Sequence, residues 1–117
     1  MKTLRAYNVQ LWVGLQRGYD GEISTIDDVR EVCDEYVSSG DCITITPIEF
    51  RYMNGHEDGV VIGWIQYPRF PRTRKQIRER AFNLAHKLQA RLGQFGVTVT
   101  TPYKSYYFER RHEVRSI

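Results

Sequence analysis

The sequence lacks most of the features by which an enzyme or a membrane protein is recognised. Its 117 residues include only two cysteines, Cys33 and Cys42, and they form no C-x-x-C motif. Two reduced structural thiols are the ordinary interpretation, and a nucleophilic cysteine is the alternative. The longest apolar run, residues 60–65, is far shorter than the roughly 20 residues that a membrane span needs, and no signal-peptide pattern follows Met1. We therefore expect a cytoplasmic protein with no metal and no cofactor.

One segment of the chain has almost no basic residues, and another has almost no acidic residues. Residues 20–41 contain eight acidic side chains and one basic one, whereas residues 69–91 contain eight basic side chains and one acidic one. The net charge of +3 conceals this separation. A molecule polarised in this way attracts an anion at one end, or a second copy of itself. We therefore expect an anionic partner or a homo-oligomer.

The first third of the chain predicts a strand followed by a helix. In residues 6–16 apolar side chains alternate with polar ones, which is typical of a strand with one buried face. Thr25 is a good N-cap, and apolar residues follow it at helical spacing over residues 26–38. The exposed face of this helix is predicted to be acidic.

Residues 42–53 and 59–67 predict a β-hairpin. Pro47 cannot donate a ladder hydrogen bond, so the first strand either lies at a sheet edge or carries a bulge there. The apolar residues also change from odd positions before Pro47 to even positions after it, and a bulge would explain that change. The second strand is apolar on both faces, which predicts a central position in the sheet.

A second helix and a last strand complete the domain. Thr73 caps a helix that ends at Gly93 and has a basic surface, and residues 96–103 alternate again. The order of elements predicts an α+β fold, the ferredoxin-like βαββαβ sandwich, with a four-stranded antiparallel sheet and two helices on one face. We expect a single domain over residues 1–108 and a charged C-terminal tail over residues 109–117.

The helix-free face of this sheet is the first candidate site. Trp12 and Trp64 would share that face if the odd positions of the third strand faced the helices. A face of this kind is covered by a second copy, by loops or by the tail, or it stacks bases. The segments L-W-V-G at residues 11–14 and G-W-I-Q-Y at residues 63–67 resemble strand motifs of RNA-recognition motif domains. This resemblance implies single-stranded nucleic-acid binding through the two tryptophans.

The second candidate is a rigid basic segment. Arg69 lies between Pro68 and Pro71, just before a helix N-terminus, whose dipole favours anions. Four cations gather there, and an anionic ligand would relieve their repulsion, the alternative being a solvated basic surface. The residues predicted to bind the ligand are Arg69, Tyr67, Phe70, Arg72, Arg74 and Lys75, with Tyr52 and Glu57 of the hairpin.

The third candidate is the hairpin loop, where His56 precedes Glu57 and Asp58. A histidine beside carboxylates can serve in acid–base catalysis, so a small phosphodiesterase-like enzyme is one alternative and an ordinary polar turn is the other. No second histidine has the spacing of a shared metal site.

Residues 42–71 resemble a group of short proteins encoded by phages and prophages. The shared pattern is T-P-x-x-F-x-Y, then Gly and Glu in the hairpin loop, then Y-P-R-F-P. The resemblance implies an accessory protein that acts against host defences in the host-cell cytoplasm. Our main hypothesis is therefore a non-enzymatic, homo-oligomeric binding protein. It would capture an anionic ligand, such as a host nucleotide signal, or an acidic protein partner.

Overall fold

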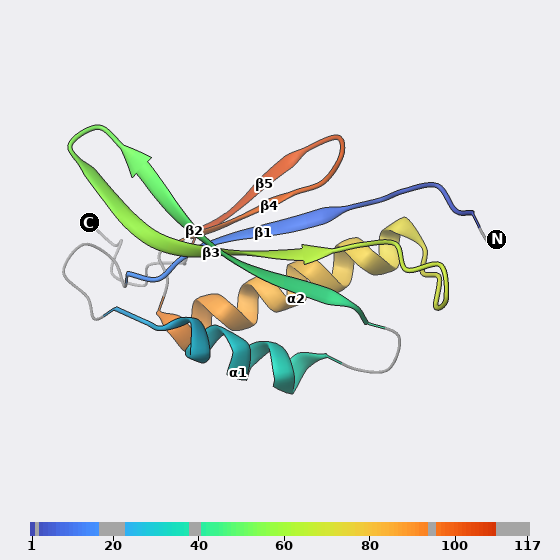
Figure 1. Cartoon of the computed structure of the whole chain (residues 1–117), viewed down its shortest axis with the longest axis horizontal. Coiled ribbons are helices and arrows are strands. Elements are labelled where there is room, and N and C mark those ends of the chain that lie inside the picture. Colours follow the sequence, from blue (N-terminus) through green and yellow to red (C-terminus); the bar gives the residue numbers. More distant parts are fainter. Residues whose placement is uncertain (2, 17–22, 38–40, 94–95, 110–117) are drawn as a thin grey trace, which may run out of the picture.

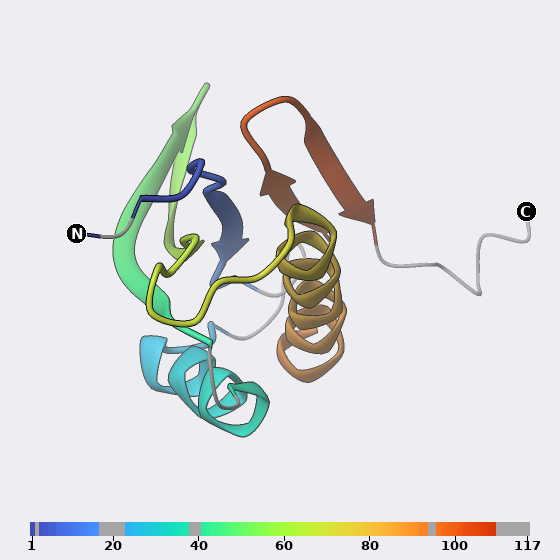
Figure 2. The same cartoon turned by 90° about the vertical axis from the view of Figure 1, so that its right-hand side faces the viewer.

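The chain folds into one antiparallel sheet with two helices packed against one of its faces. The computed structural model describes residues 1, 3–16, 23–37, 41–93 and 96–109. In chain order the elements are β1 (Val9–Gly14), α1 (Ile26–Tyr36), β2 (Ile43–Tyr52), β3 (Gly55–Trp64), α2 (Arg74–Leu92), β4 (Gly96–Thr100) and β5 (Ser105–Glu109). The strand order is β2-β3-β1-β4-β5, so β1 is central (Figure 1). Figure 2 shows both helices on the same side of the sheet.

The predicted four-stranded sheet is wrong, because the chain adds a fifth strand. β4 ends before a turn at residues 101–104, and β5 returns beside it as a new edge strand. The rings of Tyr106 and Phe108 hold β5 against α2, since they meet the ring of Phe82 at 4.9 and 5.0 Å. β5 includes the first residue of the predicted tail, residues 109–117, and the rest of that tail lies outside the described residues.

Both helices begin at a threonine in a capping box, as the sequence predicts. The hydroxyl of Thr25 accepts from the amide of Asp28, whose side chain accepts in return from the Thr25 amide, and Thr73 has the same exchange with Gln76. α2 ends at Gly93, which has a φ of 64°, a conformation that glycine adopts without strain. In the described ranges neither helix is long and apolar enough to cross a membrane.

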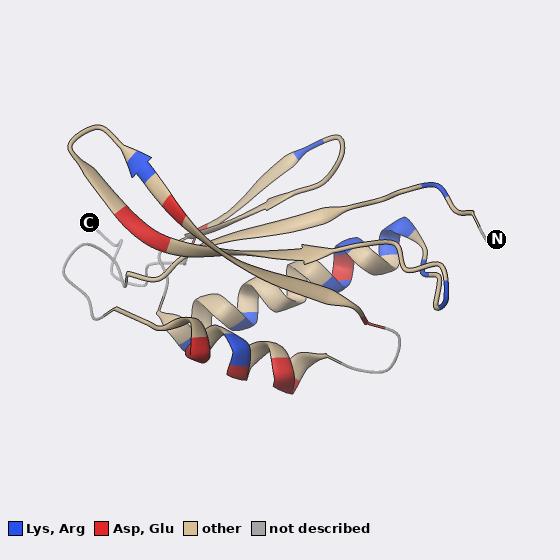
Figure 3. Ribbon diagram, viewed as in Figure 1, with Lys and Arg blue, Asp and Glu red and all other residues tan. Residues whose placement is uncertain are grey.

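The core lies between the helices and one face of the sheet. The odd residues of β1 pair across the ladder with Val60, Ile62 and Trp64 of β3, and all of these side chains are buried there. The helices lie side by side with opposite charges, and Figure 3 shows acidic residues along α1 and basic residues along α2. Arg91 of α2 pairs with Glu35 of α1 at 2.5 Å and with Glu31 at 3.5 Å. The Glu35 carboxylate accordingly raises the pKa of the Arg91 guanidinium.

The β2–β3 hairpin is regular from end to end, so the predicted bulge at Pro47 is wrong. Consecutive pairs run from Ile43↔Trp64 to Tyr52↔Gly55 with no inserted residue. β2 is an edge strand, and an edge position accommodates the missing amide of Pro47. The apolar phase changes for another reason. Before Pro47 the odd residues lie on the helix side, and after it the even apolar residues cover the opposite face.

Candidate functional site

The eight residues predicted to bind an anionic ligand do not lie together. Tyr52 and Glu57 belong to the hairpin end of β2 and β3, whereas the other six lie beyond the opposite end of β3 or at the start of α2. β3 has ten residues, and at about 3.3 Å per residue its ends are about 30 Å apart. Figure 1 shows the β2–β3 turn and the β3–α2 connection at opposite ends of the molecule.

The connection between β3 and α2 carries a small aromatic and basic cluster. The rings of Tyr67 and Phe70 meet edge to face with centroids 5.9 Å apart, and the Arg69 guanidinium carbon lies 5.5 Å from the centre of the Phe70 ring. Arg74 and Lys75 continue the exposed basic surface onto α2. The predicted basic group is therefore present in part: Arg69, Arg74 and Lys75 lie on the surface, and Arg69 is engaged with a neighbouring ring.

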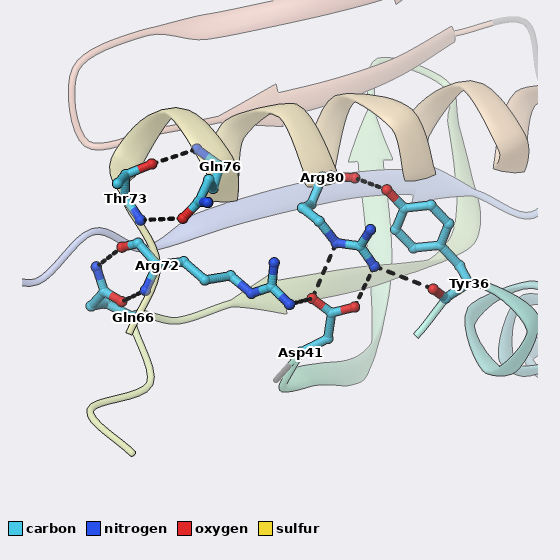
Figure 4. A network of polar contacts seen from close by, with 7 residues as sticks. All are labelled: Tyr36, Asp41, Gln66, Arg72, Thr73, Gln76 and Arg80. Carbon is cyan, nitrogen blue, oxygen red and sulfur yellow. Dashed lines mark hydrogen bonds and ion pairs between the residues drawn. The ribbon is translucent and has the colours of Figure 1, made fainter. Parts of the chain in front are cut away.

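Arg72, predicted to bind the ligand, belongs instead to a buried network (Figure 4). The carboxylate of Asp41 has no exposed surface, and it pairs with Arg72 at 3.2 Å and also with Arg80. The Gln66 side chain fixes the Arg72 backbone, donating to its carbonyl at 2.6 Å and accepting from its amide at 2.9 Å. The Tyr36 hydroxyl donates to the Arg80 carbonyl at 3.0 Å. The network therefore joins both helices to the start of β2 and to the β3–α2 connection.

Sequence reasoning missed this network because its signal is not local. Asp41 and Arg80 are 39 residues apart, and no periodic pattern links them. The opposite charges of the two halves of the chain indicated an attraction between the helices. They did not indicate which acidic residue would be buried.

Trp12 and Trp64 lie on opposite faces of the sheet, so the predicted two-tryptophan platform does not form. Trp64 pairs with the buried Val9 on the helix side, and its ring meets Tyr36 edge-on at 6.2 Å. Trp12 is half-buried on the other face, where its Nε1 donates to Thr100 Oγ1 at 3.0 Å. The prediction assumed that the odd residues of β3 face the helices, whereas the even residues do. The geometry therefore does not support bases stacked on both rings.

A pocket with acidic residues in its lining lies between the end of β1 and the start of β3, next to the β2–β3 turn. Its volume is about 170 Å³, and its lining residues are Leu15, Gln16, Ile23, His56, Glu57 and Asp58. Glu57 is half-buried, and its Oε2 accepts a hydrogen bond from the Gln16 backbone amide at 3.1 Å. The neighbouring bond between the two strands runs from the Leu15 amide to the Asp58 carbonyl at 3.0 Å. The Glu57 carboxylate thus extends the ladder at the point where the chain leaves β1.

The electrostatics of this pocket favour a cation. Glu57 and Asp58 line it, and its lining in the described part of the chain includes no Lys or Arg. Arg51 is the cross-strand partner of the lining residue His56, on the face of the hairpin opposite to Glu57, and its charge is paired with Glu49 at 3.0 Å. His56 and Glu57 are consecutive in β3, so their side chains leave opposite faces of the strand. The predicted acid–base pair therefore borders the pocket without its two members facing each other.

The chemical environment of Cys33 argues against a nucleophilic role. This residue is buried on α1, and burial, with a smaller contribution from the charge of Asp34, raises the pKa of its thiol to about 11. Because the thiolate is the reactive form, the thiol is inert near neutral pH.

Two solved structures share this fold over nearly the whole chain. The structure of a phage SAM lyase in complex with S-methyl-5′-thioadenosine matches with a TM-score of 0.67 and 17% identity, over 94% of this chain and 95% of that chain. A phage SAM lyase in the apo state matches with a TM-score of 0.69 and 15% identity, over 96% and 97%. No protein-family model and no curated protein sequence match the chain. At these identities the similarity establishes the fold alone.

These structures contradict our main hypothesis of a non-enzymatic binding protein, because they place the fold of the chain in an enzyme. That hypothesis relied on the absence of a catalytic motif. Catalytic residues that lie far apart in the sequence and meet only in the fold form no recognisable motif. The alternative of a small enzyme is therefore favoured over it.

Proposed function

We propose that the chain is a lyase-type enzyme that acts on S-adenosylmethionine or a close analogue, and that the sulfonium centre of this substrate binds beside Glu57. One observation carries the proposal. In a fold shared with a phage SAM lyase, a half-buried carboxylate borders a pocket whose described lining residues include no Lys or Arg. S-adenosylmethionine carries a permanent positive charge on sulphur, and an acidic pocket attracts it.

The chemistry of such a reaction assigns a particular role to Glu57. S-methyl-5′-thioadenosine, the compound in one comparison structure, is S-adenosylmethionine without its aminobutyrate chain. A lyase that leaves this compound breaks the bond between sulphur and Cγ of that chain, and the electron pair stays on sulphur. Cγ gains a new bond within the same fragment, either to the oxygen of the substrate's own carboxylate, which closes a lactone, or to Cβ as a double bond after Cβ gives up a proton. The positive charge therefore disappears during the reaction. A nearby carboxylate stabilises the substrate more than the transition state, so Glu57 would supply binding and orientation rather than rate.

The pocket of one chain is too small to enclose this substrate. Its volume of about 170 Å³ is below the roughly 300–1,000 Å³ of typical small-molecule sites. The sheet face beside it is apolar. Trp12, Ile48 and Phe50 are half-buried there, and Tyr52 and Tyr107 are 57% and 60% exposed. We propose that a second copy of the chain covers this face and completes the adenosine site.

The phage-type pattern in residues 42–71 gives limited support to the same proposal. Its hairpin residues Tyr52, Gly55 and Glu57 lie at the end of the molecule that carries the pocket. Its Y-P-R-F-P segment, residues 67–71, lies at the other end and has no role in the proposed site. We propose that the protein is phage-encoded and removes a host metabolite in the host-cell cytoplasm.

The decisive experiment is a turnover assay. Purified protein is incubated with S-adenosylmethionine, and the products are separated by liquid chromatography and identified by mass spectrometry. We expect S-methyl-5′-thioadenosine to accumulate in proportion to the amount of protein. The proposal is wrong if none forms and calorimetry detects no binding of S-adenosylmethionine.

A charge-removing variant tests the role of Glu57. Glu57→Gln keeps the size of the side chain and removes its charge. We expect KM to rise about tenfold, the size of a modest charge-assisted contact, while kcat changes much less. The matched control is Glu49→Gln, a charge lost from the other face of the same hairpin, where Glu49 pairs with Arg51. Equal effects of the two substitutions would remove Glu57 from the site.

A further inference from the structure

We infer that Gly14 is a positioning residue that holds the Glu57 carboxylate at the pocket wall. The identity of the ligand depends on the proposed function, whereas the contact between Gly14 and Glu57 does not depend on it. Gly14 is the last residue of β1. A Cβ atom built on it would lie 2.5 Å from Oε2 of Glu57 and 2.9 Å from the carboxyl carbon. The carboxylate therefore occupies the space that any side chain at position 14 would need.

Among the described residues, Glu57 supplies the contacts that favour glycine at position 14. Among the described glycines only Gly93 has a positive φ, so the backbone at position 14 accepts any residue. The three atoms nearest to the added Cβ all belong to Glu57. Gly59, its cross-strand partner, differs, because a Cβ there would also meet the backbone oxygen of Val13 at 2.7 Å. Since glycine is less stable than alanine within a strand, its advantage at position 14 lies in the placement of the carboxylate.

A methyl group at position 14 would act through a flexible side chain and not through the backbone. It would push the end of Glu57 away from the sheet and break the hydrogen bond from the Gln16 amide, now 3.1 Å long. The charge would then move from the pocket wall towards solvent. We therefore expect Gly14→Ala to fold as well as the wild type and to bind a cationic ligand less tightly.

Gly63 provides the matched control. It lies on the same face of the sheet as Gly14, and a Cβ there would lie 2.5 Å from Oγ1 of Thr44, which is also the free end of a side chain. Neither Gly63 nor Thr44 lines the pocket. Gly63→Ala thus repeats the steric change without touching the carboxylate.

The geometric part is tested by amide NMR and thermal unfolding, with no ligand present. We expect the Gln16 amide proton to move upfield in Gly14→Ala, as it does in any variant that loses the hydrogen bond to Glu57, and to stay in place in Gly63→Ala. The melting temperature of Gly14→Ala should equal or exceed that of the wild type. An unchanged Gln16 amide in Gly14→Ala would overturn the inference.

The functional part is tested by calorimetry with sinefungin, an amine analogue of S-adenosylmethionine that is cationic near the same position and has no sulfonium to cleave. We expect Gly14→Ala to raise Kd about tenfold, Gly63→Ala to leave it unchanged, and Gly14→Ala to have no further effect in a Glu57→Gln background. Wild-type affinity in Gly14→Ala, or the same loss in both backgrounds, would overturn the inference. If the wild type binds neither sinefungin nor S-adenosylmethionine, the proposed function fails, and the Gln16 amide alone decides whether Gly14 positions Glu57.

Discussion

Asp41→Asn tests whether the buried ion-pair network holds the fold together. The Asp41 side chain has no exposed surface, and the side chains of Arg72 and Arg80 that pair with it are 23% and 25% exposed. Asparagine keeps the shape of the side chain but removes the charge that the two guanidinium groups share. Removing one partner of a buried ion pair costs about 3–5 kcal/mol. Because both arginines retain some contact with water, we expect the lower end, a loss of about 3 kcal/mol in the free energy of unfolding.

The matched control is an exposed pair of the same chemistry. Asp27 and Arg30 lie 2.7 Å apart, but their side chains are 82% and 55% exposed, and a pair of this kind contributes about 0–1 kcal/mol. Urea unfolding followed by circular dichroism would give the two losses on one scale. In a domain of this size about 1 kcal/mol corresponds to roughly 4 °C, so Asp41→Asn should lower Tm by about 12 °C. A loss below about 1 kcal/mol, or equal losses for Asp41→Asn and Asp27→Asn, would refute the assignment of Asp41 as a buried anchor.

Three further results are expected. Leu84→Ala in the core of α2 should lower the free energy of unfolding by about 2–5 kcal/mol in urea, and a loss below this range would contradict the burial of Leu84. Cys33 should resist alkylation at pH 8 until the protein unfolds, because burial raises its pKa to about 11; labelling of Cys33 as fast as that of the half-buried Cys42 would contradict this. Light scattering should show self-association that high salt does not weaken and that Trp12→Glu disrupts, whereas a monomer at high concentration would exclude the proposed second copy.

The helices could be predicted from the sequence because their signals are local. Thr25 and Thr73 each have a capping partner three residues ahead, and Gly93 marks the end of α2. The number of strands could not be predicted in the same way. Tyr106 and Phe108 follow a proline-containing turn, beyond the last predicted strand at residues 96–103, and their contact with Phe82 on another element holds them in place as a strand.

The faces of β3 were ambiguous for a related reason. A strand that is apolar on both sides has no period to show which side meets the helices. Its register against β1 decides the question, since Trp64 lies opposite the buried Val9 and Trp12 lies opposite Val61. Register is a tertiary property, so the placement of the two tryptophans could not follow from the strand sequences alone.

The change of apolar phase in β2 connects the fold to the candidate site. Up to Pro47 the odd residues of β2 face the helices. Beyond it the hairpin extends past them, as Figures 1 and 2 show. There the odd side carries Glu49 and Arg51, an exposed ion pair, and the even side carries Phe50 opposite Glu57.

A strand that changes its buried face without a bulge packs its two halves against different partners. The first half of β2 has its partner in the helices of the same chain. The second half is only half-covered in one chain, and the acidic pocket lies beside it. The irregularity that we interpreted as a bulge therefore marks the place where the core ends and where the surface begins that we propose for a ligand and a second copy.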